Sequence, residues 1–108
     1  MIKSFCLAQL AYEKLGTMPT YAKILGSVMA HSRNMNGHSQ ANIARQMGIV
    51  QSGLAKLEKG ICSVKIMQLM KYSQLIDADY MVILQRAENL RQEIEQSGIP
   101  VPLKRSTV

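Results

Sequence analysis

The stretch that decides the fold is residues 39–60, SQANIARQMGIVQSGLAKLEKG, in which a glycine separates two short amphipathic runs. Two helices that cross steeply through a tight turn need a small residue where their axes approach, and Ala44 falls at that position. Gly48 supplies the turn, because glycine tolerates a positive φ. The spacing therefore predicts helices over 39–47 and 50–59 that share one inner apolar face. The residues of that face are Ile43, Met47, Leu54 and Leu57.

The opposite face of the two predicted helices is polar and basic. Glutamine and serine near the start of the second helix, with lysine one turn later, are donors that can reach base edges and phosphates in a major groove. Glu58 is the one acid in the stretch and lies at the end of the second helix. The outward residues are Gln40, Arg45, Gln51, Ser52 and Lys56.

The same stretch resembles the helix-turn-helix of the Cro/repressor-type (XRE) family of DNA-binding regulators. The family pattern runs Ser-Gln, apolar-Ala, Gly and then, after the recognition helix, apolar-Glu-x-Gly. The matching positions are Ser39, Gln40, Ile43, Ala44, Gly48, Leu54 and residues 57–60. The resemblance covers about residues 20–80 and implies an all-α, lambda-repressor-like domain of five helices. It also implies an ion pair between Arg33 and Glu58, with Arg33 close to a DNA phosphate.

Position by position, the resemblance implies roles at DNA. Gln40 would bond a phosphate, while Gln51, Ser52 and Lys56 would reach base edges or the backbone. Ala55 would touch a thymine methyl group or serve only as a helix former, and the flanking lysines would meet phosphates or be ordinary solvated side chains. The full set expected at DNA is Arg33, Ser39, Gln40, Arg45, Val50, Gln51, Ser52, Gly53, Ala55, Lys56, Lys59 and Lys65. The residues expected to hold the motif together are Ala44, Gly48, Leu54 and Glu58.

Two positions depart from the family pattern. The family usually caps the recognition helix with serine or threonine, whereas this chain has Val50 or Ile49 there. A lost cap costs roughly 1 kcal/mol. Gly53 lies inside the predicted recognition helix and costs about as much again relative to alanine. That glycine either lets the backbone approach DNA closely or leaves a softer helix.

The remaining sequence predicts further helices on both sides of this stretch. We expect a first helix over residues 4–15, a second over 20–34, a fifth capped by Ser63, and a last helix capped by Asp77 or Asp79 and ending near Ser97. The division is an N-terminal helical extension over 1–18, a DNA-binding domain over 19–80, a C-terminal helix over 79–98 and a flexible tail over 99–108.

The last predicted helix is long for so small a chain, and its apolar stripe spans more than three turns. Its far end, at Leu90 and Ile94, has little left in the chain to cover it, so we expect a homodimer contact there. The alternative is packing within the chain against the N-terminal helix. The expected contact residues are Tyr80, Ile83, Leu84, Ala87, Leu90 and Ile94.

Charge is distributed unevenly along the chain of 108 residues, whose net charge is +6. Residues 1–71 carry nine Lys or Arg and two acids, and residues 72–108 carry four Lys or Arg and five acids. A basic segment followed by a nearly neutral one suits a protein with a polyanion-binding face, although ordinary solvated lysines give the same composition.

Other chemistry receives little support from the sequence. No phosphate loop, paired carboxylates or nucleophile with an oriented base is visible, so we expect no enzyme and no cofactor. His31 and His38 lack acids or thiols at metal spacing, and we expect solvated or capping roles. Cys6 and Cys62 indicate buried, reduced thiols, with a disulfide or a redox-sensitive Cys62 as alternatives. The methionines expected in the core are Met29, Met47, Met67, Met70 and Met81.

Taken together, these patterns predict a dimeric repressor that binds an inverted-repeat operator in double-stranded DNA through a recognition helix over residues 50–59. We expect it to be cytoplasmic and associated with the nucleoid, with no membrane segment. An antitoxin that binds a toxin and its own operator is the main alternative. A protein-bridging module that does not read DNA is a third.

Overall fold

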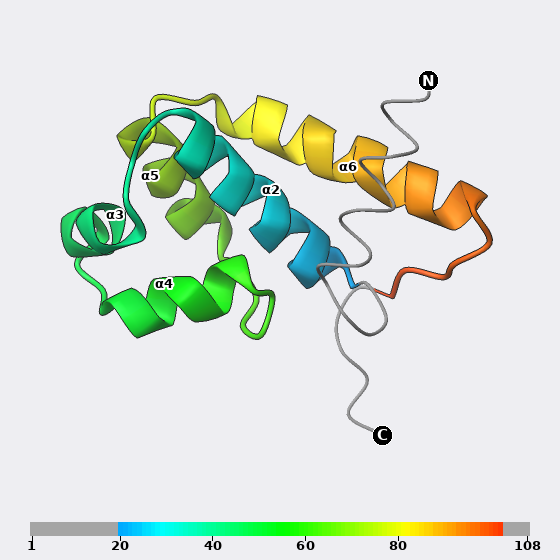
Figure 1. Cartoon of the computed structure of the whole chain (residues 1–108), viewed down its shortest axis with the longest axis horizontal. Helices are drawn as coiled ribbons and strands as arrows, with labels where there is room; N and C mark the ends of the chain where they lie inside the picture. The colour runs from blue at the N-terminus through cyan, green and yellow to red at the C-terminus, as the bar shows by residue number, and fades with distance from the viewer. Residues whose placement is uncertain (1–19, 103–108) are drawn as a thin grey trace.

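The computed structural model describes residues 20–102, and within that range the chain forms five α-helices and no strand. The expected all-α class is confirmed there, while the helix expected over 4–15, the extension over 1–18 and Cys6 lie outside the described residues. None of the helices in this range is both long and apolar enough to cross a membrane. The helices are α2 (Tyr21–Met35), α3 (Gln40–Met47), α4 (Gln51–Glu58), α5 (Ile66–Leu75) and α6 (Tyr80–Gln96) (Figure 1).

Three of the helices begin at side-chain caps, and one of them, Asp79, is among the two caps that the sequence predicts for the last helix. The Thr20 hydroxyl accepts from the Lys23 N–H at 3.2 Å, and the Ser39 hydroxyl accepts from the Asn42 N–H at 3.1 Å. Asp79 caps α6 by accepting from the Met81 N–H at 2.9 Å. Each cap satisfies a backbone donor that a helix start leaves without an intrahelical partner.

The cap predicted at Ser63 is wrong, because Lys65 holds the N-cap position of α5. The backbone N–H groups of Ile61 and Cys62 still bond to the Lys56 carbonyl at the end of α4, at 3.0 and 3.4 Å. Residue 63 therefore directly follows a turn that is bonded to the end of α4, and α5 begins only after it. At Lys65 the side chain of Gln68 reaches back and accepts from the backbone N–H at 3.0 Å.

The core lies where α2 crosses the other helices. α2 packs against both α6 and α4, while α3 packs on α4 and α5 (Figure 1). Helical spacing places apolar side chains on the inner faces, as expected for helices that bury one side. The fully buried members include Ile24, Met29, Ile43, Leu54, Leu69, Tyr72, Ile76, Ile83 and Ile94.

Two glycines allow α2 and the end of α4 to touch backbone to backbone. A Cβ atom at Gly26 would lie 2.4 Å from the carbonyl oxygen of Glu58. A Cβ atom at Gly60 would lie 2.4 Å from Lys23 Cα, and the φ of Gly60 is +75°. These positions therefore admit only glycine without a shift of the backbone. The glycine that closes the Leu-Glu-Lys-Gly sequence is explained by packing against α2.

The reason for expecting a dimer contact on α6 is wrong, because the apolar stripe of this helix is covered within the chain. Ile83, Ala87, Leu90 and Ile94 are 1%, 7%, 7% and 1% exposed. α6 lies along α2 for much of its length, so α2 covers the stripe (Figure 1). Tyr80 and Leu84, the other two expected contacts, are half-buried and pack against the same core.

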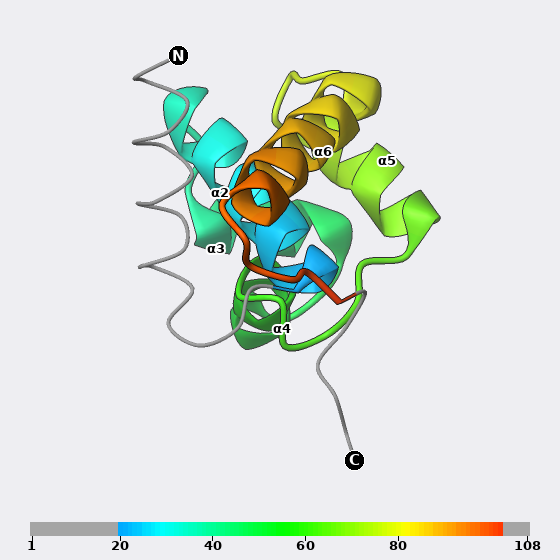
Figure 2. The ribbon, with the colours of Figure 1, turned by 90° about the vertical axis from the view of Figure 1, so that its right-hand side faces the viewer.

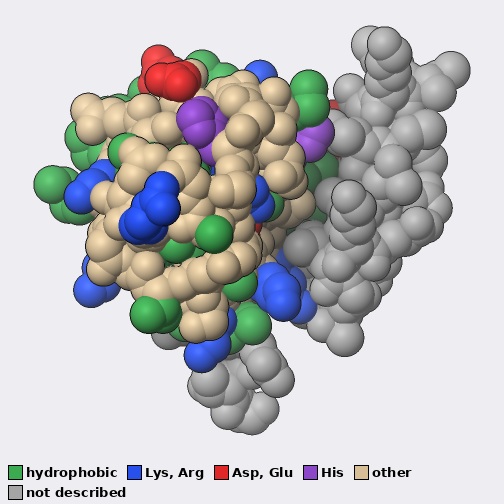
Figure 3. Space-filling model, turned by 60° about the vertical axis from the view of Figure 1, so that its left-hand side comes forward, with side chains coloured by type: hydrophobic (Ala, Val, Ile, Leu, Met, Phe, Trp, Pro, Cys, Tyr) green, Lys and Arg blue, Asp and Glu red, His purple; other side chains and the backbone are tan. Residues whose placement is uncertain are grey.

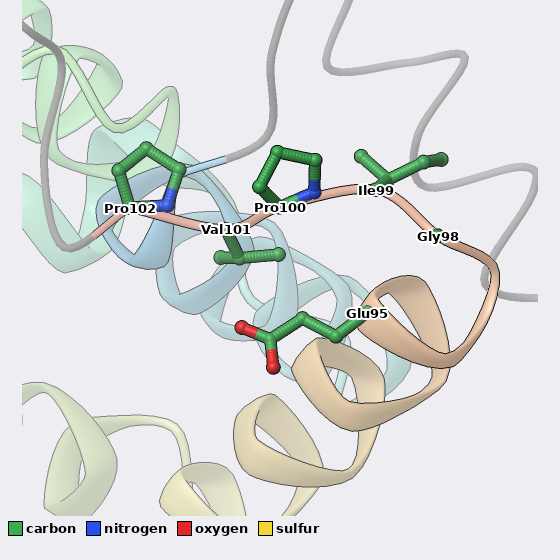
Figure 4. Close-up of a pocket in the computed structure, with 6 residues that line it drawn as sticks. All are labelled: Glu95, Gly98, Ile99, Pro100, Val101 and Pro102. Atoms are coloured by element: carbon green, nitrogen blue, oxygen red, sulfur yellow. The ribbon is translucent and has the colours of Figure 1, made fainter.

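The chain after α6 folds back toward the start of α2 (Figure 2). This return segment also helps to cover the apolar stripe of α6. The Tyr21 N–H donates to the Pro102 carbonyl at 2.9 Å, and Val101 is 9% exposed. Figure 4 shows the Val101 side chain on the opposite side of this segment from the rings of Pro100 and Pro102. Residues 99–102, the part of the expected flexible tail that the structure describes, therefore have no helix or strand but pack back toward α2, while 103–108 lie outside the described range.

Arg91 joins α6 to the start of α2. Its guanidinium donates to Glu88 and Glu95 on its own helix and lies 5.4 Å from the centre of the Tyr21 ring. The hydrogen bonds that Arg91 donates to Glu88 and Glu95 raise the pKa of Arg91 above its ordinary value. Burial of the ring raises the pKa of Tyr21.

Several expected core residues lie at the surface. Met29 is fully buried and Met47 half-buried, but Met67, Met70 and Met81 are 72%, 37% and 58% exposed. Each of these three lies on a side of α5 or α6 that faces away from the other helices, so their assignment to the core is wrong. The expectation of a buried Cys62 thiol is also wrong, because Cys62 is exposed in the turn after α4.

Candidate nucleic-acid interface

α3 and α4 meet through a three-residue connection that matches the predicted spacing. Gly48 ends α3 with φ +75° and ψ +27°, and its N–H donates to the Arg45 carbonyl at 3.1 Å. Ala44 is 1% exposed, and the Ile49 N–H donates to its carbonyl at 3.0 Å. Leu54 is 0% exposed on the facing side of α4. The small residue, the left-handed glycine and the inner leucine thus lie where the sequence predicts them.

The carboxylate of Glu58 lies at the centre of the cluster that holds this pair in place. Arg33 on α2 forms a two-point ion pair with it, Nε to Oε2 at 2.8 Å and Nη2 to Oε1 at 3.0 Å. Both side chains are buried, at 8% and 5% exposed. Paired hydrogen bonds of this kind are the strongest that a carboxylate makes with arginine. The hydrogen bonds with Glu58 raise the pKa of Arg33 above its ordinary value.

Two further side chains fill the remaining positions on the same carboxylate. Gln40 on α3 donates to Oε1 at 3.0 Å, and the Tyr72 hydroxyl on α5 lies 2.7 Å from Oε2. Burial and the hydrogen bond with Glu58 raise the pKa of Tyr72 well above its ordinary value, so the phenol keeps its proton and donates it. One carboxylate on α4 is therefore bonded to α2, α3 and α5. A buried charge that is paired and fully hydrogen-bonded fixes the geometry around it.

The cluster continues to the surface through Gln51. The Gln51 amide donates to Gln40 Oε1 at 3.3 Å, so the first residue of α4 is tied to the first residue of α3. Gln51 is exposed, whereas Gln40 is half-buried. Both helix starts are thus held at a fixed separation by side chains that begin at Glu58.

Arg33, which the resemblance places near a phosphate, is held inside the protein. Arg33 is 7% exposed, and its Nη1 donates to Asn34 Oδ1 at 3.2 Å and to the His38 carbonyl at 2.9 Å. With Glu58 on the other side, every nitrogen of the guanidinium already has a partner within the protein. Arg33 is a structural residue of the cluster, and the ion pair implied for it is present.

The other expected contact residues divide into two sets. Gln40, Gly53 and Ala55 are half-buried. The exposed set comprises Ser39, Arg45, Val50, Gln51, Ser52, Lys56, Lys59 and Lys65. Lys65 stands apart from the rest, beyond the turn that follows α4. The remaining members lie on α3 and α4 or are the cap residues of these helices.

Charge separates residues 20–76, which include α3 and α4, from the rest of the described chain. Residues 20–76 contain seven Lys or Arg and one acid, Glu58. Because Glu58 is 7% exposed and bonded to Arg33, that single acid does not reach the surface. Residues 77–102 contain five acids and two arginines. On the face shown in Figure 3, Lys and Arg side chains are scattered widely, and the conspicuous acidic group lies at the upper edge.

The two departures from the family pattern are both visible. Val50 is the N-cap of α4, makes no side-chain cap bond and is 70% exposed. A Cβ atom at Gly53 would lie 3.5 Å from Val50 Cγ2, an ordinary contact, so packing does not require the glycine there.

Tyr72 is the member of the Glu58 cluster that sequence reasoning misses. A tyrosine on the apolar side of a helix resembles a core aromatic, and its ring is indeed 0% exposed. The usable signal is chemical: a buried phenol needs a hydrogen-bond partner, and Glu58 is the one acid in residues 20–76.

Neither a protein-family model, nor a curated protein, nor a solved structure matches this chain.

Proposed function

We propose that this protein is a sequence-specific, double-stranded-DNA-binding regulator that acts as a dimeric repressor. α3 and α4 form its helix-turn-helix, and α4 enters the major groove. The observation that carries the proposal is the state of Glu58. The one acid of α4 is turned inward and neutralised, which leaves an exposed helix face with only neutral polar and basic side chains. Such a face suits a polyanion.

The side chains on that face have the chemistry to read a groove. Gln51 and Ser52 lie in the first turn of α4, and Lys56 lies one turn later. Glutamine pairs with adenine through two hydrogen bonds, and lysine donates to guanine. Gln51 already bonds to Gln40, so its amide is oriented before DNA arrives. Arg45 and Lys59 are also exposed and would bond phosphates, which position the protein without reading bases.

Repression would be steric. Two copies of α4 would enter successive major grooves about 34 Å apart and so cover one inverted-repeat operator. Affinity would fall as salt rises, because each lysine or arginine at a phosphate releases counterions on binding.

The proposal is tested by comparing single variants on a fluorescent duplex carrying a selected site and on a scrambled duplex. Gln51→Ala or Ser52→Ala should reduce the preference for the selected site by about 1–3 kcal/mol if the residue makes a specific contact. Lys59→Ala should weaken binding to both duplexes similarly. Arg86→Ala removes an exposed charge from α6 and is the matched control, with affinity unchanged.

Binding that is equally weak on every duplex and equally reduced by Gln51→Ala, Ser52→Ala and Lys59→Ala would contradict base readout by α4. Arg86→Ala losing as much affinity as Lys59→Ala would contradict the placement of DNA on α3 and α4.

A further inference from the structure

α5 exposes apolar side chains that the fold does not use. Ile66, Met67 and Met70 are 56%, 72% and 37% exposed. Ile66 and Met67 lie four and three residues before Met70, so the three side chains lie along one side of the helix, next to the side that buries Leu69 and Tyr72 (2% and 0% exposed). An exposed apolar stripe on a helix is typical of a surface that binds another protein. Methionine suits such a surface because its flexible side chain adapts to the partner.

The two ends of α5 carry opposite charge. Lys65 is the exposed N-cap of α5. At the other end, the α5–α6 turn supplies Asp77 and the α6 cap supplies Asp79, both exposed. The helix between them has 10 residues, which corresponds to a length of about 15 Å. His38 faces Asp77, with Nε2 at 3.5 Å from Oδ2, but the Asp77 side chain is still 84% exposed.

This arrangement is complementary to itself. A two-fold axis at the middle of the α5 stripe makes the two copies of the helix antiparallel. The same surface of each copy then contacts the other copy. Lys65 of each copy then opposes the acidic end of the other. A uniformly acidic or basic partner would match one end and repel the other. Lys71 lies on the exposed side of α5, where its long stem lets the ammonium reach water at the rim.

We propose that a second copy of this chain covers the α5 stripe, so that the homodimer forms through antiparallel α5 helices rather than through α6. The biological role of this contact rests on the proposed function, since two copies are needed to read an inverted repeat. The contact itself requires no DNA.

The experiment is sedimentation equilibrium of the full chain without DNA, over a range of protein concentrations. The wild-type chain should associate to a dimer. Met67→Glu should raise the dimer dissociation constant about tenfold or more, because it places a charge in a desolvated apolar contact. Lys65→Glu should also weaken the dimer by setting a carboxylate against the acidic end of the other copy. Met35→Glu is the matched control, since Met35 is a methionine of equal exposure at the end of α2 (71%).

Circular dichroism confirms that each variant is folded before association is compared. A dimer unchanged by Met67→Glu and Lys65→Glu, or one broken equally by Met35→Glu, overturns the α5 contact. A wild-type chain that stays monomeric at every concentration overturns it too. These outcomes are separate from the proposed function, because binding to a duplex carrying a single half-site is measured independently and fails only if α3 and α4 do not bind DNA.

Discussion

Two clusters of arginine and glutamate in this molecule use the same chemical groups in very different settings. Around Glu58, an ion pair at 2.8 Å joins Arg33 to a carboxylate 25 residues away, and both side chains are nearly inaccessible. Around Arg91, the partners Glu88 and Glu95 lie three and four residues away on the same helix, and their side chains are 39% and 41% exposed.

The difference shows that burial and connectivity, rather than the distance between charges, decide what an ion pair does. The surface cluster links residues that α6 already holds together, and water screens it. The Glu58 cluster links four helices, and each of its charges would be costly in the interior without its partners. The orientation of the exposed α4 face therefore depends on a group that the solvent does not reach.

The largest effect is expected from Glu58→Gln, which keeps the shape of the side chain and leaves the Arg33 guanidinium buried without a counter-charge. Breaking a buried ion pair by removing one partner typically lowers the free energy of unfolding by about 3–5 kcal/mol. Urea unfolding followed by circular dichroism measures this change. Glu95→Gln on the surface cluster is the control, and equal losses for the two variants would contradict the distinction between the clusters.

A smaller loss is expected from Tyr72→Phe, which removes one donor to the Glu58 carboxylate while the ring continues to fill its site. A hydrogen bond to a charged group contributes about 1.5–3 kcal/mol. The same urea experiment applies, and Tyr21→Phe is the control because the Tyr21 ring lies against Arg91 at the surface cluster. A stability unchanged by Tyr72→Phe would show that the Tyr72 hydroxyl is not bonded to Glu58 in solution.

A gain in stability is expected from Val50→Thr. This variant tests whether a capping hydrogen bond at the surface contributes more to stability than the surface ion pairs of Arg91 do. Val50 has the extended backbone of an N-cap, with φ −72° and ψ +150°, but offers no side-chain acceptor. A threonine oxygen would stabilise the start of α4 by about 1 kcal/mol. Val50→Ala keeps the position uncapped and should show no gain in thermal unfolding. Equal behaviour of the two variants would contradict the capping argument.

The smallest effect is expected at the surface cluster. The hydrogen bonds from Arg91 lower the pKa of Glu88 to about 2. Because the folded-state pKa is lowered, the stabilisation is present above the ordinary carboxyl pKa and is lost as the pH falls toward 2. An NMR titration of the Glu88 side chain should show the low midpoint, and Glu88→Gln should change stability less than Val50→Thr does. A midpoint near the ordinary value would show that the pair with Arg91 does not persist in water.

The parts of the fold that follow from local spacing could be predicted from the sequence. Ala44, Gly48 and Leu54 lie where the interval between them requires, and Thr20, Ser39 and Asp79 cap the helices that they precede. These features depend on a few neighbouring residues, so a linear pattern contains them. The pairing of Arg33 with Glu58 was available only through the family resemblance, because nothing local connects two residues that far apart.

The parts that depend on tertiary packing could not be predicted. The apolar stripe of α6 resembles an interface until α2 and the return segment at Val101 are seen to cover it. The exposed stripe of α5 resembles a core face for the converse reason, since Met67 and Met70 are three residues apart, as side chains on one face of a helix are. Sequence periodicity shows that a helix has an apolar side, but not which neighbour covers it.

Selection of bound sites from a random duplex library at near-physiological salt, followed by sequencing of the bound pool, tests the central claim most directly. The account predicts an enriched inverted repeat whose half-site centres lie about one helical turn apart. A pool without enrichment, from weak binding that disappears as the salt concentration rises, would contradict sequence-specific reading by α4.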